Sequence, residues 1–176
     1  PGLADFQGQS FHTHEWPREP VSFAGKRVAV IGTGATGIQA ITEIAKTADT
    51  LTVFQRTPQW SAPLHNSKVT PDEMREIRGN YAEIFARCQQ TVGCFVHDAD
   101  PRSVFEVTQE EREAFWEQRY AEPGFGIWMG NFRDVLTDHE ANRLMSEFLA
   151  RKVRERVTDP ATAEKLIPKT LSLIHI

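Results

Sequence analysis

Three glycines near the start of the chain have the spacing of a phosphate-binding loop, Gly32-x-Gly34-x-x-Gly37. The first permits a tight turn, the second lets the backbone approach a pyrophosphate, and the third allows a helix to pack closely on a strand. A helix that begins here would offer unpaired N–H groups and the positive end of its dipole to the phosphates. We therefore expect a dinucleotide-binding site. Its candidate residues are Gly32, Thr33, Gly34, Ala35, Thr36, Gly37 and Gln39.

The residues that follow the next predicted strand, 51–54, indicate which dinucleotide is bound. An NAD site usually places a carboxylate here to bind the ribose 2′-hydroxyl, whereas this chain has Gln55-Arg56-Thr57. A guanidinium can bind a 2′-phosphate through two hydrogen bonds, and a threonine hydroxyl can donate a third. Arg56 and Thr57 therefore favour NADPH, against the alternative that Arg56 is a solvated loop charge.

Other residues that could carry chemistry lack a supporting arrangement. His97, Asp98 and Asp100 could suggest a metal site, but a loop of this composition is usually just solvated. His139 lies beside Glu140 at an expected helix start, and nothing else completes a hydrolytic triad. The sequence predicts no metal centre and no catalytic role for these groups.

The glycine loop requires a strand before it and a helix after it. Residues 26–31 contain the apolar run Val-Ala-Val-Ile, which predicts a short buried strand. Ile38, Ile41 and Ile44 recur at helical spacing and predict a helix from the loop to about Ala48. Strand, turn, helix and second strand predict an α/β fold with a Rossmann-like βαβ unit.

The segment that follows is predicted to be mostly helical. Thr70-Pro71 with Glu73 forms a capping box with proline at the first helical position, which predicts a helix to about Thr91. Further helices are expected over about 109–121, over about 139–157 and after Asp159-Pro160. Two more capping boxes are expected, Thr108 with Glu111 and Thr137 with Glu140. The expected buried stripe of the first helix is Ile77, Tyr81, Ile84, Phe85 and Cys88.

A second motif precedes the glycine loop, Phe6-x-Gly8-x-x-x-His12-x-x-x-Trp16-Pro17. It resembles the signature of Baeyer–Villiger monooxygenases, with every signature residue in place. The segments GTGATGIQ and QRTPQW also resemble sequences of that family. Flavin-containing monooxygenases and N-hydroxylases carry a related motif, usually without the Trp-Pro ending.

The signature also permits a reading from its residues. It lies just before the first strand, so we expect a linker that changes shape as the reduced cofactor moves relative to the flavin. Gly8 would supply backbone freedom, and His12 can donate and accept hydrogen bonds. The resemblance implies that His12 influences catalysis indirectly. The alternative is a satisfied histidine beside a buried tryptophan.

The resemblance implies an enzyme that binds FAD and NADP(H) and consumes NADPH and O2. Hydride transfer to the flavin would be followed by a C4a-peroxyflavin that converts a ketone to an ester or lactone. The cofactors would supply the difficult chemistry, while the protein positions them and excludes water. A flavin-containing N- or S-monooxygenase is the nearest alternative. A non-catalytic dinucleotide-binding module is a second one.

The resemblance also implies that the chain is a fragment of a flavoprotein with two dinucleotide-binding domains, inactive by itself. The FAD-binding loop would lie upstream, and the arginine that stabilises the peroxyflavin would lie downstream. The expected parts are a linker with the signature over 1–25, the first part of the NADP-binding domain over 26–69, a helical insertion over 70–167 and a truncated end over 168–176. Residues 171–176 look like the translation of a sequencing adaptor, against the alternative of a genuine apolar tail.

The aromatic residues of the insertion allow two interpretations. At helical spacing such residues are usually simple core, and the resemblance allows a ketone-binding surface instead. These residues are Phe115, Trp116, Phe125, Trp128 and Phe132.

Composition is that of an ordinary globular chain. The 176 residues carry 20 basic against 24 acidic side chains, for a formal charge of −4 and a pI of about 5.9. This balance gives no reason to expect nucleic acid or an anionic membrane as a partner, and the apolar runs are too short to span a bilayer. Cys88 and Cys94 have no nearby ligand cluster, so we expect thiols and a cytoplasmic location. Oligomeric state is not predicted.

Overall fold

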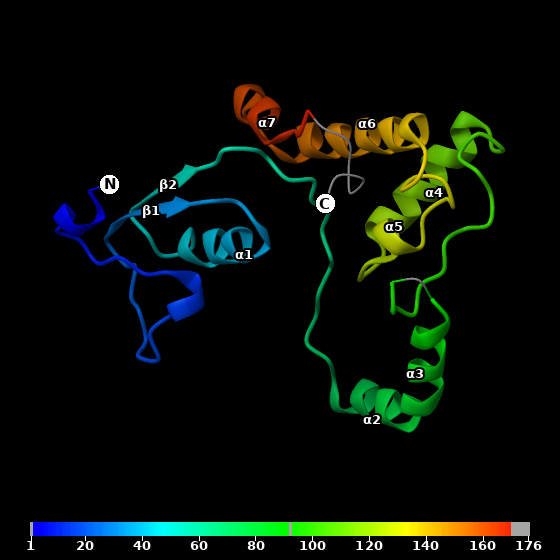
Figure 1. Ribbon diagram of the computed structural model, residues 1–176, viewed down its shortest axis with the longest axis horizontal. Coiled ribbons are helices and arrows are strands. Elements are labelled where there is room, and N and C mark those ends of the chain that lie inside the picture. The colour runs from blue at the N-terminus through cyan, green and yellow to red at the C-terminus, as the bar shows by residue number, and fades with distance from the viewer. Residues whose placement is uncertain (1, 92, 170–176) are drawn as a thin grey trace. The chain divides into compact units, whose positions relative to one another are not determined.

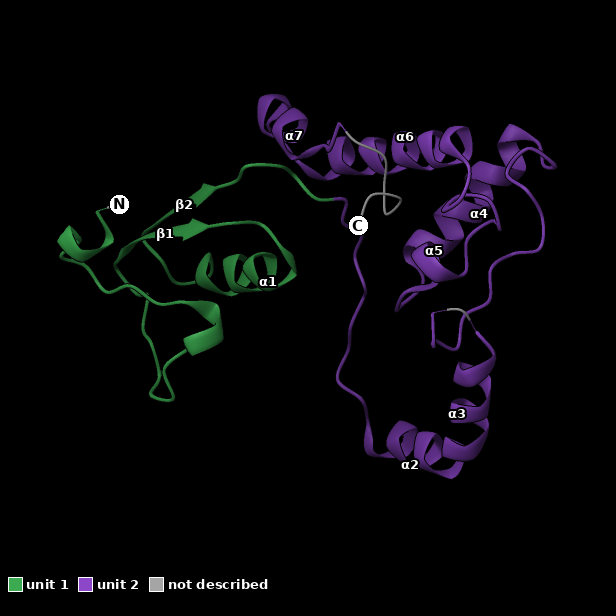
Figure 2. Cartoon of the chain, in the orientation of Figure 1, with its two compact units in different colours: residues 1–59 green, residues 60–176 purple. Residues whose placement is uncertain are grey.

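The computed structural model describes residues 2–91 and 93–169, and the chain divides into two compact units (Figure 1). The first unit comprises residues 1–59 and the second residues 60–176, as Figure 2 shows in two colours. The expectation that residues 171–176 derive from an adaptor lies outside the described residues.

The first unit contains the predicted βαβ arrangement. Strand β1 (Arg27–Ile31) and strand β2 (Thr50–Phe54) pair in parallel, with Arg27 opposite Thr50 and Ile31 opposite Phe54. Helix α1 (Ala35–Ile44) connects them. Two short 3-10 helices, η1 (Leu3–Asp5) and η2 (Thr13–Glu15), precede the first strand. The predicted α/β fold is confirmed, and both strands lie within one residue of their predicted bounds.

Helix α1 ends four residues earlier than predicted, at Ile44 rather than near Ala48. After Ile44 the chain tightens, because the N–H groups of Lys46 and Thr47 bond to carbonyls only three residues back. Ala48 then forms a bridge with Ala24, and the N–H of Asp49 bonds to the Lys26 carbonyl. These links draw the chain into β2 before another helical turn can form.

The strand predicted over residues 26–31 is present as β1, but the prediction that it is buried is wrong. Ile31 is 87% exposed and Ala29 is exposed, while Val28 and Val30 are half-buried. Alternate residues of a strand point to opposite faces, so α1 covers one face of the sheet. Among the described residues of this unit, nothing comparable covers the other. An unbroken apolar run is typical of a strand that is buried on both faces of its sheet.

The second unit is helical, as predicted. Its helices are α2 (Pro71–Gly79), α3 (Tyr81–Gln90), α4 (Gln109–Ala121), α5 (Gly126–Met129), α6 (His139–Arg156) and α7 (Pro160–Leu166). The core lies between α4, α5, α6 and the connecting loops. It is formed by Val104, Trp116, Ile127, Phe132, Val135, Ala141, Met145, Phe148 and Leu149. In the described part of the chain, none of the helices is long and apolar enough to cross a membrane.

The single helix predicted from Pro71 to about Thr91 is instead two helices. The break is at Asn80, where φ is −107° and ψ is 13°. The Asn80 N–H bonds to the carbonyls of both Glu76 and Ile77, and this closes α2. Gly79 and Asn80 are weak helix formers, so their pairing favours a break.

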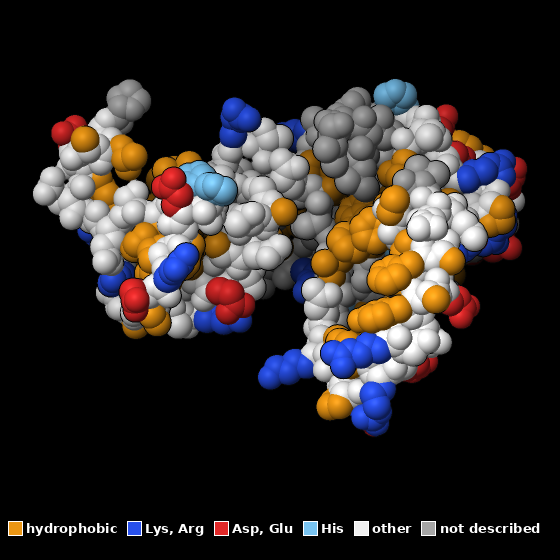
Figure 3. All heavy atoms as spheres, turned by 60° about the horizontal axis from the view of Figure 1, so that its bottom comes forward, with side chains coloured by type: hydrophobic (Ala, Val, Ile, Leu, Met, Phe, Trp, Pro, Cys, Tyr) orange, Lys and Arg blue, Asp and Glu red, His pale blue; other side chains and the backbone are white. Residues whose placement is uncertain are grey.

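The buried stripe predicted for this helix is also wrong. Ile77, Tyr81 and Phe85 are exposed, and Ile84 and Cys88 are half-buried. Neither α2 nor α3 packs extensively on another element of the described residues. Figure 3 shows a group of apolar side chains, coloured orange, on this face of the second unit. Helical periodicity predicted the apolar stripe, but burial depends on what packs against it.

Two of the three predicted capping boxes are present. Thr70 with Glu73 and Thr108 with Glu111 each exchange both hydrogen bonds. The box predicted for Thr137 with Glu140 is wrong, because Asp138 caps α6. Its carboxylate accepts from the N–H groups of residues 140 and 141, both at 2.9 Å. A carboxylate one residue nearer the helix displaces the threonine hydroxyl. The short helix predicted after Asp159 is confirmed as α7, with the Asp159 carboxylate as its cap.

Candidate nucleotide-binding site

The glycine loop follows β1 directly and is anchored to the neighbouring strand. Gly32 has φ of 102°, a left-handed conformation that favours glycine. Its N–H donates to the carbonyl of Phe54 at 2.8 Å, so the last residue of β2 holds the start of the loop. The loop therefore begins where the two parallel strands end, which is where open α/β sheets bind ligands.

Gly37 and Gly34 meet different surroundings. A Cβ at Gly37 would lie 2.6 Å from the carbonyl oxygen of Gly32, so only glycine allows α1 to approach the loop this closely. A Cβ at Gly34 would meet nothing within 4 Å. Gly34 is the N-cap of α1, and no side chain caps the N–H groups of the first turn. The first turn also contains no acidic residue. This open, uncapped helix end has the geometry and the dipole to accept a pyrophosphate.

Arg56 and Thr57 lie beside this loop, in the turn that follows β2. Both are exposed. The hydroxyl of Thr33, in the glycine loop, donates to the Thr57 carbonyl at 3.5 Å. Within the described residues, Arg56 makes no hydrogen bond or ion pair, and its guanidinium faces solvent. The structure thus brings the predicted 2′-phosphate residues next to the predicted pyrophosphate loop, and Gln39 is exposed on α1.

The signature segment has an ordered local structure in the same unit. His12 caps η2, and its Nδ1 accepts from the N–H of His14 at 3.2 Å. The proton of a neutral His12 ring therefore lies on Nε2. The Phe6 ring covers Gly8, where a Cβ would lie 2.5 Å from the ring. Pro17 is half-buried at the end of the motif.

Trp16 is 42% exposed and lies between two other rings, with centroid distances of 5.6 Å to Phe11 and 6.2 Å to Phe23. The alternative of a histidine beside a buried tryptophan therefore lacks its buried partner within this unit. The side chain of Lys26 donates to Gln9 at 2.9 Å and ties the segment to the start of β1. Among the described residues, no hydrogen bond joins His12 to the glycine loop.

The aromatic residues of the insertion form a core rather than an open surface. Trp116 and Phe132 are buried, and Phe115 and Trp128 pack against the same cluster. The Trp116 indole donates to Asn131 Oδ1 at 2.9 Å, so its polar group is satisfied. Phe125 differs, since it is exposed and pairs with Phe95 at 5.2 Å. Of the five candidates, Phe125 alone has the exposure that a substrate contact would need.

The acidic and histidine residues form no metal site in residues 2–91 and 93–169. Asp98 pairs with Arg87, and Asp100 accepts two hydrogen bonds from the Arg102 guanidinium at 2.9 and 2.8 Å. This Arg102 fork holds the pKa of Asp100 below its ordinary value. Cys88 is half-buried and Cys94 is exposed, and both are free thiols.

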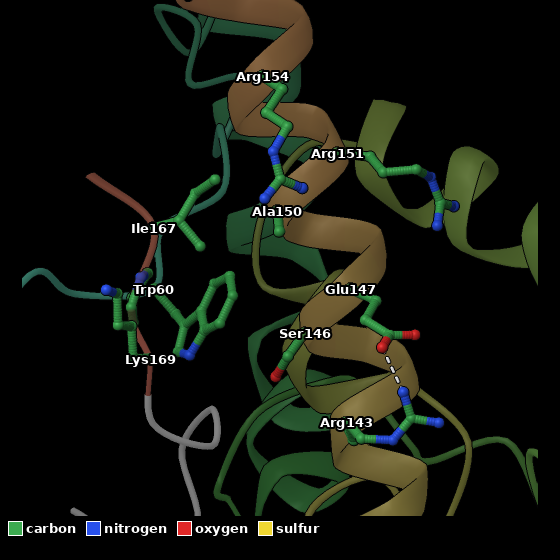
Figure 4. A pocket seen from close by; sticks show the side chains of 10 residues that line it. Trp60, Arg143, Ser146, Glu147, Ala150, Arg151, Arg154, Ile167 and Lys169 are labelled. Carbon is green, nitrogen blue, oxygen red and sulfur yellow. Dashed lines mark hydrogen bonds and ion pairs between the residues drawn. The ribbon is translucent and has the colours of Figure 1, made fainter. Parts of the chain in front are cut away.

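A groove that the sequence reasoning missed lies in the second unit, with a volume of about 770 Å³ (Figure 4). Trp60, Ile167 and Lys169 line one side, opposite the side chains of α6. Its arginines are paired with carboxylates: Arg143 with Glu140 and Glu147, Arg151 with Glu113, and Arg154 with Glu164. The positive charge of these three arginines is therefore largely neutralised by carboxylates.

Known proteins provide an independent comparison. A family model described as flavin-binding monooxygenase-like matches residues 1–85. The 2-oxo-Δ3-4,5,5-trimethylcyclopentenylacetyl-CoA monooxygenase of Pseudomonas putida is 47% identical over 174 residues, which is 96% of this chain and 32% of that protein. A Baeyer–Villiger monooxygenase of Pseudooceanicola batsensis is 37% identical over 171 residues, which is 97% of this chain and 31% of that protein. The chain is homologous to the Baeyer–Villiger monooxygenases.

A solved structure extends this similarity to the fold. The crystal structure of OTEMO in complex with FAD and NADP matches with a TM-score of 0.93 and 46% identity, over 96% of this chain and 32% of that chain. The chain therefore spans about a third of the length of the Baeyer–Villiger monooxygenases that it matches. The expected relationship to a two-cofactor flavoprotein of this family is confirmed, and the match includes the signature segment, the glycine loop and the helices.

Proposed function

We propose that this chain is part of an NADPH-dependent Baeyer–Villiger monooxygenase that uses O2 to convert ketones to esters or lactones, and that it carries the NADP-binding site. The observation that carries the proposal is the complete signature from Phe6 to Pro17 in one unit with a glycine loop. The sequence and fold of monooxygenases with this chemistry support it.

The residues present fit NADP(H). The pyrophosphate would lie at the N-terminus of α1, against the N–H groups of the loop and the open side of Gly34. The 2′-phosphate would bind Arg56 and the Thr57 hydroxyl, because Arg56 is exposed and without a partner among the described residues. Binding the dinucleotide in this way orients its nicotinamide, which is the protein's part in hydride delivery.

FAD supplies the oxygen-activating chemistry when bound. We assign no residue of this chain to it, because the sequence contains one glycine loop of this type and that loop fits NADP. The signature segment acts indirectly in this proposal. His12 holds the turn of η2 through Nδ1 and keeps its Nε2 proton for a second partner. This leaves it able to stabilise more than one arrangement of the linker.

The proposed substrate is a small-molecule ketone, and ring ketones are the first class to test because the Pseudomonas putida relative is named for an oxo-substituted ring. We also propose a cytoplasmic location, which the two free thiols support. Neither nucleic acid nor a membrane is proposed as a partner, in keeping with the formal charge of −4.

Coupled consumption assays on the complete protein test the proposal. A ring ketone should stimulate NADPH oxidation and O2 uptake in equal amounts, and NADH should support much less. His12→Ala should lower the yield of ester per NADPH consumed. Oxidation of a thioether or amine without any ketone conversion would favour the heteroatom monooxygenase. Nucleotide binding without oxygen uptake would favour the non-catalytic module.

A further inference from the structure

Thr33 differs from its neighbours in the glycine loop because it is buried. It is 8% exposed, while Gly34, Ala35 and Thr36 are exposed. Its hydroxyl donates to the Thr57 carbonyl at 3.5 Å, across 24 residues of sequence. A hydroxyl placed in this way serves the protein's own backbone rather than a ligand.

The Thr57 carbonyl belongs to the peptide bond that precedes Pro58. A residue before proline is restricted to extended conformations, and proline has no N–H to anchor the turn. The orientation of this carbonyl therefore determines how the Arg56–Thr57 turn is presented. The bond from Thr33 is a constraint on that orientation from the glycine loop.

A second link lies one residue away and belongs to the main chain. The Gly32 N–H donates to the Phe54 carbonyl at 2.8 Å. This bond aligns the start of the loop with the end of β2, but it lies two residues before Arg56. The Thr33 bond lies one residue after Arg56. The turn that carries Arg56 is thus held to the loop on both sides.

We propose that Thr33 is a positioning residue that strengthens the preference for NADP(H) over NAD(H). It holds Arg56 and Thr57 at the separation from the pyrophosphate loop that a 2′-phosphate requires. This inference rests on the proposed NADP site. It adds a residue that touches neither phosphate through its side chain but sets the distance between their two binding sites.

The test is equilibrium binding to the complete protein, measured by calorimetry. The probes are adenosine 2′,5′-bisphosphate and 5′-AMP, which differ only in the 2′-phosphate, followed by NADP+ and NAD+. Thr33→Val preserves the shape of the side chain and removes the hydroxyl. Loss of one hydrogen bond should reduce the ratio of the two affinities about fivefold. Thr33→Ser keeps the hydroxyl and should keep the wild-type ratio. Thr33→Ala serves as a second hydroxyl-free variant if the valine variant does not fold.

Two results would overturn the inference. One is a ratio that stays at the wild-type value in the hydroxyl-free variants, including the case in which both probes lose affinity equally. The other is a loss in the serine variant as large as in the valine variant, since this indicates general damage to the loop. Arg56→Ala separates this from failure of the proposed site. If Arg56→Ala abolishes the preference and Thr33→Val leaves it, only the role of Thr33 is wrong. If the wild-type protein itself has no preference for NADP+ over NAD+, both the proposed NADP site and the proposed role of Thr33 are wrong.

Discussion

At the scale of single residues, glycine is favoured at each of the three loop positions for a different physical reason. Gly32 adopts a left-handed φ of 102°, Gly37 leaves room for the Gly32 carbonyl, and Gly34 leaves room for a ligand. The spacing alone predicted the tight turn at Gly32 and the close packing at Gly37, because both follow from the strand–turn–helix geometry. The approach of a phosphate to Gly34 stays a prediction. The Thr33–Thr57 contact was not predictable, since it depends on the register of β1 and β2.

Replacing two of these glycines should separate folding from binding. Gly34→Ala places a methyl group in open space at φ of −67°, which alanine tolerates, so the fold should persist. NADP+ affinity should fall at least about tenfold, because the methyl group occupies the phosphate approach. Gly37→Ala forces a Cβ to 2.6 Å from a backbone oxygen and should cost about 1–3 kcal/mol in stability. Thermal midpoints and NADP+ titrations of the complete protein would measure both. An unfolded Gly34→Ala variant, or an unchanged midpoint for Gly37→Ala, would contradict this division.

Arg56 carries the predicted discrimination between the two dinucleotides. Its guanidinium is exposed and has no partner among the described residues, so its removal should leave the fold unchanged. Arg56→Ala should weaken NADPH binding by about 10- to 150-fold, from the loss of about 1.5–3 kcal/mol of charge-assisted hydrogen bonding. Arg56→Lys, which keeps the charge but not the fork, should give an intermediate loss. The dissociation constants of NADPH and NADH measure the effect. Equal losses of affinity for NADPH and NADH would show that Arg56 does not bind the 2′-phosphate.

At the scale of elements, local chemistry predicted where most helices begin, and non-local packing decided what they bury. Four consecutive residues are enough to specify a helix start at Thr70, at Thr108 and at Asp159. The break at Asn80 and the exposure of Phe85 were not foreseen, because periodicity identifies an apolar face without identifying its partner. The same reason explains why the apolar run of β1 predicted a burial that one helix alone does not provide.

Asp100 joins two segments of the helical unit and gives it a pH-dependent link. Its N–H donates to the Asn131 carbonyl at 2.8 Å, and its carboxylate holds the Arg102 fork. Because the hydrogen bonds from Arg102 lower the pKa of Asp100, this link stabilises the fold fully above the ordinary aspartate pKa of about 3.9. The stabilisation is lost as the pH falls through the lowered value in the folded state.

A carboxyl-carbon NMR titration would measure this pKa directly. Asp100 should titrate below about 3.9, and Arg102→Gln should raise its pKa toward that value, because the hydrogen bonds from the Arg102 guanidinium are then removed. Glu164, whose pKa is lowered by the hydrogen bonds from Arg154, provides an internal control whose pKa Arg102→Gln should leave unchanged. An Asp100 pKa at or above 3.9 in the unmodified protein would show that the fork does not form.

At the scale of the whole molecule, the chain spans about a third of the relatives that it matches. Its first unit exposes Ile31 and Phe54 at the ends of its two strands, and its second exposes the apolar face of α2 and α3. The sequence predicted this relationship through the signature and the glycine loop together. It could not predict which surfaces remain open, because helical and strand periodicity identifies an apolar face without identifying what packs against it.

The chain by itself should not oxidise ketones. Purified residues 1–170 should consume no O2 with NADPH and a ring ketone, because the chain offers one nucleotide loop for a reaction that needs two cofactors. FAD fluorescence and oxygen uptake would test this, with the complete protein as the control. Stoichiometric FAD binding and ester formation by these residues alone would contradict the assignment of the loop to NADP.

The most direct test of the central claim is the origin of the oxygen atom in the product. The complete protein would be supplied with NADPH, a ring ketone and ¹⁸O2, and the product analysed by mass spectrometry. We predict a lactone that carries one ¹⁸O atom, with one NADPH oxidised for each lactone formed, and a large loss of product in Gly34→Ala. A lactone without label, or NADPH oxidation that no ketone accelerates, would contradict the assignment of this chain to a Baeyer–Villiger monooxygenase.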